Sequence, residues 1–362
     1  MATKVPGVVR FAAVGDLLLT PPPKAVPYRR DPALISPAAR SLVAQCDVAF
    51  ANLECTLPGD GSCIPTEPLL IATAELVRSV KTAGFRLVTL ANNHVLDCLD
   101  RGFQNLRCLL DELGLRYFGA GWNLDEAAAP AILEVNGVRL AFLGAVDPQT
   151  GPYRFASPDG SGVPALDVAR LARQVRDLRC SVDHVLISLH WGEERFSVPS
   201  PAQVEQAHRL VDAGASMILG HHPHVLQGLE IYRRAPIIYS LGNFVADNVH
   251  FSDGDAIRWN RVQRTGCILL AEISKAKIEN VRQVPTHDSG RLVDVDASRF
   301  GRRRIEQTRR AIAGGVSIAR YRRERLWVKT IRPFFGHLRW SKLKRLRWRQ
   351  ICNTFRGFLQ SK

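Results

Sequence analysis

Five short apolar stretches, each followed directly by polar residues, constrain the fold of this sequence more than any other feature. They lie at residues 8–14, 47–51, 86–91, 184–189 and 217–219. Short stretches that are apolar throughout and bounded by turn residues are typical of strands buried on both faces. The sequence therefore predicts a sheet whose central strands are covered on both sides.

Apolar residues recur at helical spacing between these stretches, which predicts helices at 74–83, 102–113, 166–178 and 201–213. Ser200 and Pro201 begin the last helix as N-cap and first-turn residue, and Gly214 ends it. Hairpins are predicted at 131–146, 229–241 and 267–284. Strands that alternate with helices, together with antiparallel hairpins, indicate a layered α/β fold.

Polar residues that could carry chemistry follow the five apolar stretches: Asp16, Asn52, Glu54, Asn92, Asn93, His94, His190, His221, His222 and His224. In α/β sheets, binding sites form beyond the carboxyl ends of the strands. Carboxylates, amide oxygens and imidazoles together make a mixed nitrogen and oxygen ligand set, which suits Zn, Mn, Fe or Ni better than a thiolate site would. The convergence of these strand ends therefore predicts a metal site.

Each motif also has an ordinary structural explanation when it is taken alone. Asp16 and Glu54 could cap turns, a double asparagine can satisfy a left-handed turn, and His94 could be a packed histidine. The stretch 220–224, Gly-His-His-Pro-His, differs, because three imidazoles in four residues have no common structural use. This stretch is the main basis of the metal-site interpretation, and the other strand ends support it.

Seven stretches follow one another in the order of a known family: GDLLLT (15–20), DVAFANLE (47–54), LANNHVLDCLDRGFQNL (90–106), GAG (119–121), HWGEE (190–194), AGASMILGHHPHVLQGLE (213–230) and IIYSLGNF (237–244). On these stretches the sequence resembles the CapA family, which is implicated in bacterial capsule and poly-γ-glutamate synthesis. The resemblance covers residues 10–290. It implies a fold of the calcineurin-like metallophosphoesterase type, a layered α/β/β/α sandwich.

The resemblance also implies roles for individual residues. The implied ligands of one or two divalent ions, Mn, Zn or Fe, are Asp16, Glu54, Asn93, His190, His222 and His224. The position that bridges two ions is Asn52 or Glu54, and we favour Glu54 because a carboxylate bridges cations better. His94 corresponds to the catalytic imidazole, and Asp97 either orients His94 or caps the following helix.

Other residues are expected around the ligands or facing a substrate: Asn52, Asn92, His221, Glu193 and Asn243. His221 could exchange roles with His222, Glu193 could be a solvated acid, and the stretch around Asn243 could be a glycine turn. The sequence departs from the wider phosphoesterase pattern at Leu18, where those enzymes usually have a histidine. One ion would therefore have fewer ligands, which argues against ordinary phosphatase activity.

The net charge of +15 comes from the end of the chain. Residues 301–362 hold 19 Lys and Arg against two acidic residues, whereas residues 1–300 carry a net charge of −2. We therefore predict a metallophosphatase-fold domain at 1–300 and a basic helical tail at 301–362. Tryptophan and phenylalanine among the basic residues favour peripheral binding of the tail to an anionic membrane, with docking on the body or on another subunit as the alternative. Nucleic acid is not favoured, because no recognised binding module accompanies the charge.

The sequence contains eight cysteines, several of them inside helix or strand patterns, and no C-x-x-C pair. This distribution favours reduced thiols and a cytoplasmic location, with peripheral contact at the inner face of the membrane through the tail. The apolar stretch at the N-terminus is short and runs into a strand end, which argues against a signal peptide.

Three functions are compatible with these features. The first, which the resemblance implies, is a metal-dependent hydrolase in capsule or poly-γ-glutamate biosynthesis, acting on a polyanionic polymer or a phosphorylated substrate. The second is a phosphoester hydrolase for a small molecule or nucleotide. The third is a non-catalytic polymer-binding or scaffold subunit with a structural metal site.

Overall fold

The computed structural model describes residues 6–331, and contacts within the chain divide it into two units, Met1–Val316 and Ser317–Lys362. The first unit contains the strands β1 (Val8–Leu18), β2 (Val48–Leu53), β3 (Leu87–Thr89), β4 (Arg116–Phe118), β5 (Ala131–Val135), β6 (Val138–Val146), β7 (His184–His190), β8 (Met217–His221), β9 (Leu229–Tyr232), β10 (Ala235–Ile238), β11 (Asn243–Ala246), β12 (Val249–His250), β13 (Ala256–Ile257), β14 (Thr265–Ser274), β15 (Ile278–Asp288) and β16 (Val293–Val295). Its helices are α1 (Pro37–Ala44), α2 (Ala74–Thr82), α3 (Leu99–Glu112), α4 (Leu124–Ala128), α5 (Val168–Leu178), α6 (Pro201–Asp212) and α7 (Arg299–Ile312), with a 3-10 turn at Pro148–Thr150.

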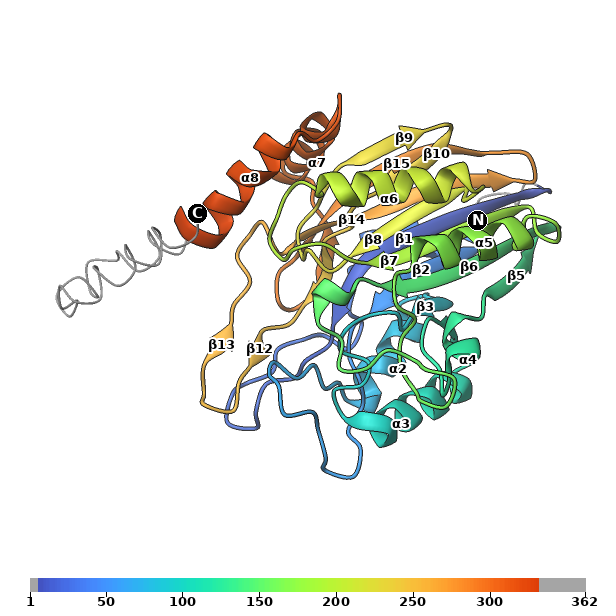
Figure 1. Cartoon of the computed structure of the whole chain (residues 1–362). Coiled ribbons are helices and arrows are strands. Elements are labelled where there is room, and N and C mark those ends of the chain that lie inside the picture. Colours follow the sequence, from blue (N-terminus) through green and yellow to red (C-terminus); the bar gives the residue numbers. More distant parts are fainter. Residues whose placement is uncertain (1–5, 332–362) are drawn as a thin grey trace, which may run out of the picture. The chain divides into compact units, whose positions relative to one another are not determined.

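Two sheets form the centre of the first unit (Figure 1). In the first sheet, β1 pairs in parallel with β2, which continues through β3 to β4, and antiparallel with β14, which continues through β15 to β16. β11 pairs in parallel with the end of β1. The second sheet has the order β5-β6-β7-β8-β10-β9, in which β6, β7, β8 and β10 are parallel. The strands that precede the polar stretches all take part in parallel pairs: β1, β2, β3, β7 and β8.

Three hydrophobic clusters show that the two sheets are stacked between two layers of helices. One cluster joins the first sheet to α1, α2 and α3, and includes Phe103. A second lies between the two sheets and includes Phe50 and Phe142. A third joins the second sheet to α5 and α6, which cover it in Figure 1, and includes Leu171 and Leu210. The fold is therefore the layered α/β/β/α sandwich that was expected from the sequence.

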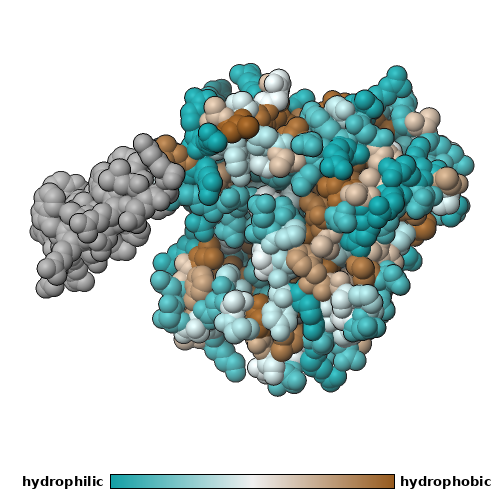
Figure 2. Space-filling model, in the orientation of Figure 1, coloured by the Kyte–Doolittle hydropathy of each residue, from teal (hydrophilic) through white to brown (hydrophobic). Residues whose placement is uncertain are grey.

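On the face that Figure 2 shows, the surface is less apolar than the buried clusters. Hydrophobic residues gather there in small patches, each bordered by hydrophilic residues. Small separate patches are normal for a protein surface. The described residues that are visible on this face therefore form no broad apolar area.

The predicted elements agree with the structure in type and place. The expected helices correspond to α2, α3, α5 and α6, and the expected hairpins to β5–β6, β9–β10 and β14–β15. α6 begins with a capping box, in which Ser200 and Gln203 each accept the backbone N–H of the other. The sequence analysis missed β4 and β11, because three or four residues carry too little periodicity to be recognised.

α7 packs within the first unit, although the sequence analysis included it in the basic tail. Most of its arginines are exposed, whereas Ile305 and Ile312 are buried in the second and third hydrophobic clusters. Gly228 makes room for this helix, because a Cβ there would lie 2.4 Å from Ile312 Cδ1. The compact unit therefore continues to Val316, past the expected boundary near residue 300.

In the second unit the structure describes α8 (Ile318–Leu326) and a π-helical turn (Trp327–Ile331). α8 has no buried residue, and Ile318 and Trp327 are 61% and 52% exposed. The tryptophans and phenylalanines on which the membrane prediction rests, at positions 340–358, lie outside the described residues. Within residues 6–331, no helix has both the length and the apolar character needed to cross a bilayer.

Candidate metal centre

The carboxyl ends of the parallel strands of both sheets meet at one place. In the first sheet, Asp16 of β1 is in register with Asn52 of β2 on one side and with Asn243 of β11 on the other. In the second sheet, His190 ends β7 and is in register with His221, which ends β8. His221 Nδ1 lies 3.1 Å from Asp16 Oδ1, so the two sheets present these side chains to each other.

Two glycines allow the backbone segments around this place to approach closely. A Cβ at Gly15 would lie 1.7 Å from the carbonyl oxygen of Gly242, and a Cβ at Gly220 would lie 2.0 Å from that of Tyr239. A larger residue at Gly15 would push away the segment that carries Asn243. Glycine is therefore needed before the aspartate and histidine motifs because a larger residue would clash with the neighbouring backbone.

Asp16 is the centre of a buried hydrogen-bonded cluster. Its carboxylate oxygens lie 2.9 Å from Asn52 Nδ2 and 3.3 Å from His224 Nδ1, in addition to the contact with His221. The backbone N–H of His222 donates to Asp16 Oδ2 at 3.3 Å. Burial opposes the charge of Asp16, but the hydrogen bonds and charges of His221 and His224 hold its pKa well below the usual value. Asp16 is therefore an anion at neutral pH.

The orientation of Asn52 bears on the bridging position that the sequence left open. The backbone N–H of His94 donates to Asn92 Oδ1 at 3.1 Å, and Asn92 Nδ2 donates to the carbonyl oxygen of Leu53 at 2.9 Å. A backbone N–H can only donate and a carbonyl oxygen can only accept, so these two partners determine which end of the Asn92 amide is Oδ1 and which is Nδ2. Asn92 Nδ2 also donates to Asn52 Oδ1 at 3.1 Å. Asn52 therefore turns Nδ2 toward Glu54 Oε2, at 3.3 Å. An amide nitrogen of this kind is a donor rather than a metal ligand, so Glu54 is the one of the two residues whose side chain offers this place a ligand oxygen.

His190 and Asn93 meet at another side of the cluster. His190 Nε2 lies 2.9 Å from Asn93 Oδ1 and 3.6 Å from Glu54 Oε1. Asn93 Nδ2 donates to the carbonyl oxygen of Thr150 at 3.1 Å, which leaves Asn93 Oδ1 facing His190. Burial keeps the pKa of His190 well below its usual value, and the repulsion that a second proton on His222 would cause lowers it further. His190 is therefore neutral, as an imidazole ligand has to be.

His94 and Asp97 form a pair beside this cluster. His94 Nδ1 lies 2.9 Å from Asp97 Oδ2, which also accepts the backbone N–H of Leu70 at 2.7 Å. The side chain of His94 is 13% exposed, whereas that of Asp97 is fully buried. Asp97 thus holds the imidazole through Nδ1 and leaves Nε2 as the atom that can exchange a proton. This contact is that of an orienting residue, and Cys98, not Asp97, is the N-cap of α3.

Two overlapping groups of buried side chains have the spacing of metal ligands, with the ligand atoms of each group within 4.8 Å of one another. The groups are Glu54, His222 and His224, and Asp16, Glu54 and His190. Among the described residues, Glu54 Oε1, His221 Nε2 and His222 Nδ1 are buried polar atoms without a hydrogen-bond partner. Glu54 and His222 belong to these ligand groups, so a bound cation could partner them. The residues therefore fit a divalent cation that prefers nitrogen and oxygen ligands.

The backbone at this place is also strained. His222 and His224 have φ values of 91° and 55°, in the left-handed region that non-glycine residues seldom adopt. Such residues cost about 1–3 kcal/mol each and cluster at functional sites. Both strained residues here belong to one of the two ligand groups.

The protein groups by themselves leave a proton on the pair formed by Glu54 and His224. Burial and the charge of Asp16 raise the pKa of Glu54 well above its usual value. Burial alone would lower the pKa of His224, but Glu54 and Asp16 raise it to about 10. Burial and the charge of His224 lower the pKa of His222 to about 3, so His222 is neutral. A cation bound here would have to displace the proton of the Glu54–His224 pair.

Four other positions bear on the site. Asn243 Oδ1 lies 2.9 Å from His224 Nδ1 and so helps to orient this imidazole. Leu18 is buried in the core beneath the helices, so the position without a histidine offers no other ligand. Glu193 lies half-buried in the turn after β7, and its role stays a prediction. The sequence analysis missed Trp259, whose ring centroid is 5.3 Å from that of His224, because it lies in a loop without a recognisable motif.

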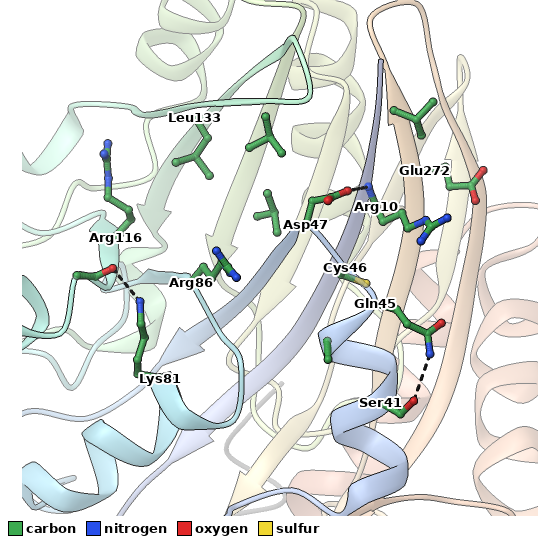
Figure 3. A pocket seen from close by; sticks show the side chains of 15 residues that line it. Arg10, Ser41, Gln45, Cys46, Asp47, Lys81, Arg86, Arg116, Leu133 and Glu272 are labelled. Atoms are coloured by element: carbon green, nitrogen blue, oxygen red, sulfur yellow. Dashed lines mark hydrogen bonds between the residues drawn. The ribbon is translucent and has the colours of Figure 1, made fainter. Parts of the chain in front are cut away.

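A separate groove of about 1380 Å³ lies at the opposite ends of β1, β2, β3 and β4. Figure 3 shows its lining, which includes Arg10, Lys81, Arg86, Arg116, Asp47 and Glu272. Within residues 6–331, neither group of metal-ligating side chains belongs to this lining. The cluster at the carboxyl ends of the strands, and not this groove, therefore holds the candidate site.

The stacked sheets and the buried cluster define a class: a layered α/β protein with a candidate metal centre between its sheets. The model of one protein family, "Bacterial capsule synthesis protein PGA_cap", matches residues 10–248. The chain belongs to this family, which confirms the resemblance drawn from its sequence.

The names of individual relatives of the chain also refer to capsule or polymer synthesis. The chain is 40% identical over 182 residues to the capsule biosynthesis protein CapA of Bacillus anthracis, covering 49% of this chain and 44% of the relative. It is 36% identical over 177 residues to the PGA biosynthesis protein CapA of Bacillus subtilis, covering 48% and 46%. It is also 34% identical over 212 residues to a probable polyglutamine synthesis accessory protein of Mycobacterium tuberculosis, covering 56% of each. The chain thus spans about half the length of these relatives.

Solved structures with a related arrangement are more distant. A hypothetical protein from Thermus thermophilus has a TM-score of 0.48 and 15% identity, covering 77% of this chain and 99% of that one. The NAD nucleotidase of Haemophilus influenzae has a TM-score of 0.45 and 13% identity, covering 86% and 57%. The sheet order and the three hydrophobic clusters define the fold of this chain.

Proposed function

We propose that this protein is a metal-dependent hydrolase that acts in the biosynthesis of a polyanionic polymer of the poly-γ-glutamate class. The observation that carries the proposal is the sharing of Glu54 by two buried ligand groups at the meeting point of the sheets. A shared carboxylate between two such groups is the arrangement expected where two cations are bridged.

The chemistry follows from the residues around Glu54. Asp16, Glu54, Asn93, His190, His222 and His224 would hold the ions. Bound cations of this kind supply a water molecule whose pKa is low enough to provide hydroxide near neutral pH.

Proton transfer is the task of His94 in this proposal. Asp97 holds Nδ1 of His94, so the other ring nitrogen, Nε2, is the atom that would give a proton to a leaving group. His94 sits beside the ligands rather than among them, which suits a general acid because its proton is not displaced by a cation.

The substrate class comes from the family and its relatives. Two of the relatives are named for capsule or PGA biosynthesis, and one for polyglutamine synthesis. Since this chain spans about half of their length, their substrate is carried over as part of the proposal. A phosphoester substrate is a second candidate, with Leu18 against it because that position supplies no imidazole.

A non-catalytic role is the third candidate, and the word "accessory" in the name of the Mycobacterium tuberculosis relative favours it. In that case the site would hold a structural ion, and the chain would bind the polymer or another subunit. This candidate predicts no catalytic turnover of a substrate, whereas the other two predict turnover.

Elemental analysis of the purified chain, followed by turnover assays, tests the proposal. We expect one or two transition-metal ions per chain in the wild type, lost in Asp16→Ala and His222→Ala. The control is His208→Ala, which removes a histidine that contacts Glu230 outside the site and should keep the metal. Cleavage of poly-γ-glutamate by the loaded protein supports the first candidate, and release of phosphate from aryl phosphates supports the second. Retained metal without turnover on either substrate would favour the accessory role. Absence of metal after incubation with Mn or Zn would refute both hydrolase candidates and favour a scaffold role in which these residues form a polar binding pocket.

A further inference from the structure

Cys63 and Cys98 lie in contact although 35 positions separate them in the sequence. Their Sγ atoms are 3.2 Å apart, and both are free thiols. A disulfide has an S–S distance of about 2.05 Å, so the sulfur atoms would have to approach by about 1 Å to form one. Side-chain rotation can supply a movement of this size.

The backbone on both sides of the pair is already held in place. Cys63 belongs to the segment 57–70, which we call the 57–70 loop. The backbone N–H of Ile64, next to Cys63, donates to the carbonyl oxygen of Asp97, next to Cys98, at 2.9 Å. The side chain of Asn105 on α3 donates to the carbonyl oxygen of Pro58 at 2.8 Å. The two cysteines therefore face each other within an existing contact.

The two thiols differ in access to solvent. Cys63 is half-buried, whereas Cys98 is buried at the N-cap of α3. Burial and the contact with Cys63 raise the pKa of Cys98 to about 12. An oxidant from solvent would therefore meet Cys63 first, and Cys98 would be the second thiol to react.

We propose that Cys63 and Cys98 are a reversible disulfide site, oxidised by low-molecular-weight disulfides, which clamps the 57–70 loop to the turn that carries His94 and Asp97. The thiolate of Cys63 attacks one sulfur of the small disulfide and releases one small thiolate. The sulfur of Cys98 then loses its proton to solvent, attacks Cys63 Sγ and releases the second small thiolate. The pair loses two electrons, and the small disulfide is reduced to two thiols.

The clamp would act next to the candidate general acid. Asp97 Oδ2 contacts both His94 Nδ1 and the backbone N–H of Leu70, at the end of the same loop. The covalent bond would be added at the residue that follows Asp97. The 57–70 loop and the His94 turn would therefore lose mobility together. This inference concerns a modification site and does not depend on the proposed hydrolase activity.

The test uses the full folded chain with three other cysteines replaced. Cys108 and Cys180 are exposed and Cys352 lies outside the described residues, so Cys108→Ser, Cys180→Ser and Cys352→Ser remove competing reactions. The protein is equilibrated with oxidised and reduced glutathione, quenched with acid, alkylated and analysed by mass spectrometry. We expect loss of two hydrogen atoms, a linked peptide pair containing residues 63 and 98, and reversal by reduced glutathione.

The dependence on glutathione identifies the product. The ratio of bridged to reduced protein should rise in proportion to [GSSG]/[GSH]², because two small thiols are released for each bridge. A first-power dependence on [GSH] would mean a stable glutathione adduct on Cys63 and would overturn the proposal. Lack of oxidation in the folded chain, when the urea-unfolded chain is oxidised, would overturn it too.

Matched variants and hydrogen exchange complete the test. Cys63→Ser, at a half-buried position that should tolerate the change, must abolish the bridge, and Cys46→Ser, at another half-buried thiol, must leave it. Backbone amides in peptides 57–70 and 93–99 should exchange at least about tenfold more slowly after oxidation. Unchanged exchange in both peptides would refute the clamp even if the bridge forms.

Discussion

Metal affinity should rise with pH well above neutrality, because the site holds a proton that ordinary metal sites have already lost. The pKa of His224 is raised to about 10 by Glu54 and Asp16, and the pKa of Glu54 is itself raised. The proton is carried by either Glu54 or His224. In both cases at least one proton must leave before the two side chains can bind a cation together. Each pH unit between 7 and 10 should then increase the apparent affinity about tenfold.

Isothermal titration of Mn²⁺ into the metal-free protein, in buffers with different ionisation enthalpies at pH 7.5, counts the protons released per ion. We expect about one or more, whereas a site with an unshifted histidine would release only about 0.1. His208→Asn serves as the control, because His208 contacts Glu230 away from the ligands and should leave the count unchanged. A count near zero, with an affinity that stays flat from pH 7 to 8.5, would refute the electrostatic reasoning.

Three further predictions concern the general acid, the core and the tail. His94→Ala should leave the metal content unchanged and lower turnover about 10²–10⁴-fold, as measured by steady-state kinetics; equal turnover would remove His94 from the mechanism. Arg30→Met should lower the free energy of unfolding by about 3–5 kcal/mol in urea denaturation, because Arg30 is buried with hydrogen bonds of 2.6–3.0 Å to Asp247 and Asp288. A loss below about 1 kcal/mol would contradict this account of the buried charges. Deletion of residues 317–362, which leaves α7 in place, should abolish flotation with anionic vesicles, and undiminished flotation would exclude the tail as the membrane contact.

The sequence was sufficient for the elements that carry strong local signals. Apolar strands that end in aspartate, asparagine and histidine motifs predicted where the site would form, because the carboxyl ends of parallel strands share an edge. The structure does bring Asp16, Glu54, His190 and His224 within contact distance. Their roles as ligands stay a prediction until metal content is measured.

Other features depend on contacts that no local pattern encodes. The orientation of Asn52, which bears on whether Asn52 or the favoured Glu54 bridges two ions, could not be read from the sequence, because it rests on two backbone groups that orient the neighbouring Asn92 amide. The charge count extended the tail back to residue 301, because the exposed arginines of α7 outnumber the few isoleucines that pack in the core. The Cys63–Cys98 contact was missed because the cysteines belong to different segments and no C-x-x-C spacing marks them.

The pairing of β1 with β14 has a consequence for anyone who expresses part of this chain. The family match ends at residue 248, whereas β14 begins at Thr265 and pairs with β1 from Val8 to Ala13. A fragment cut at the end of the match would leave the strand that carries Asp16 with an unpaired, apolar edge. Such an edge is a template for association with other chains and hence for aggregation. The stretch matched by the family model is therefore shorter than the smallest fragment that keeps this edge of β1 covered, and an expressed fragment should extend through α7.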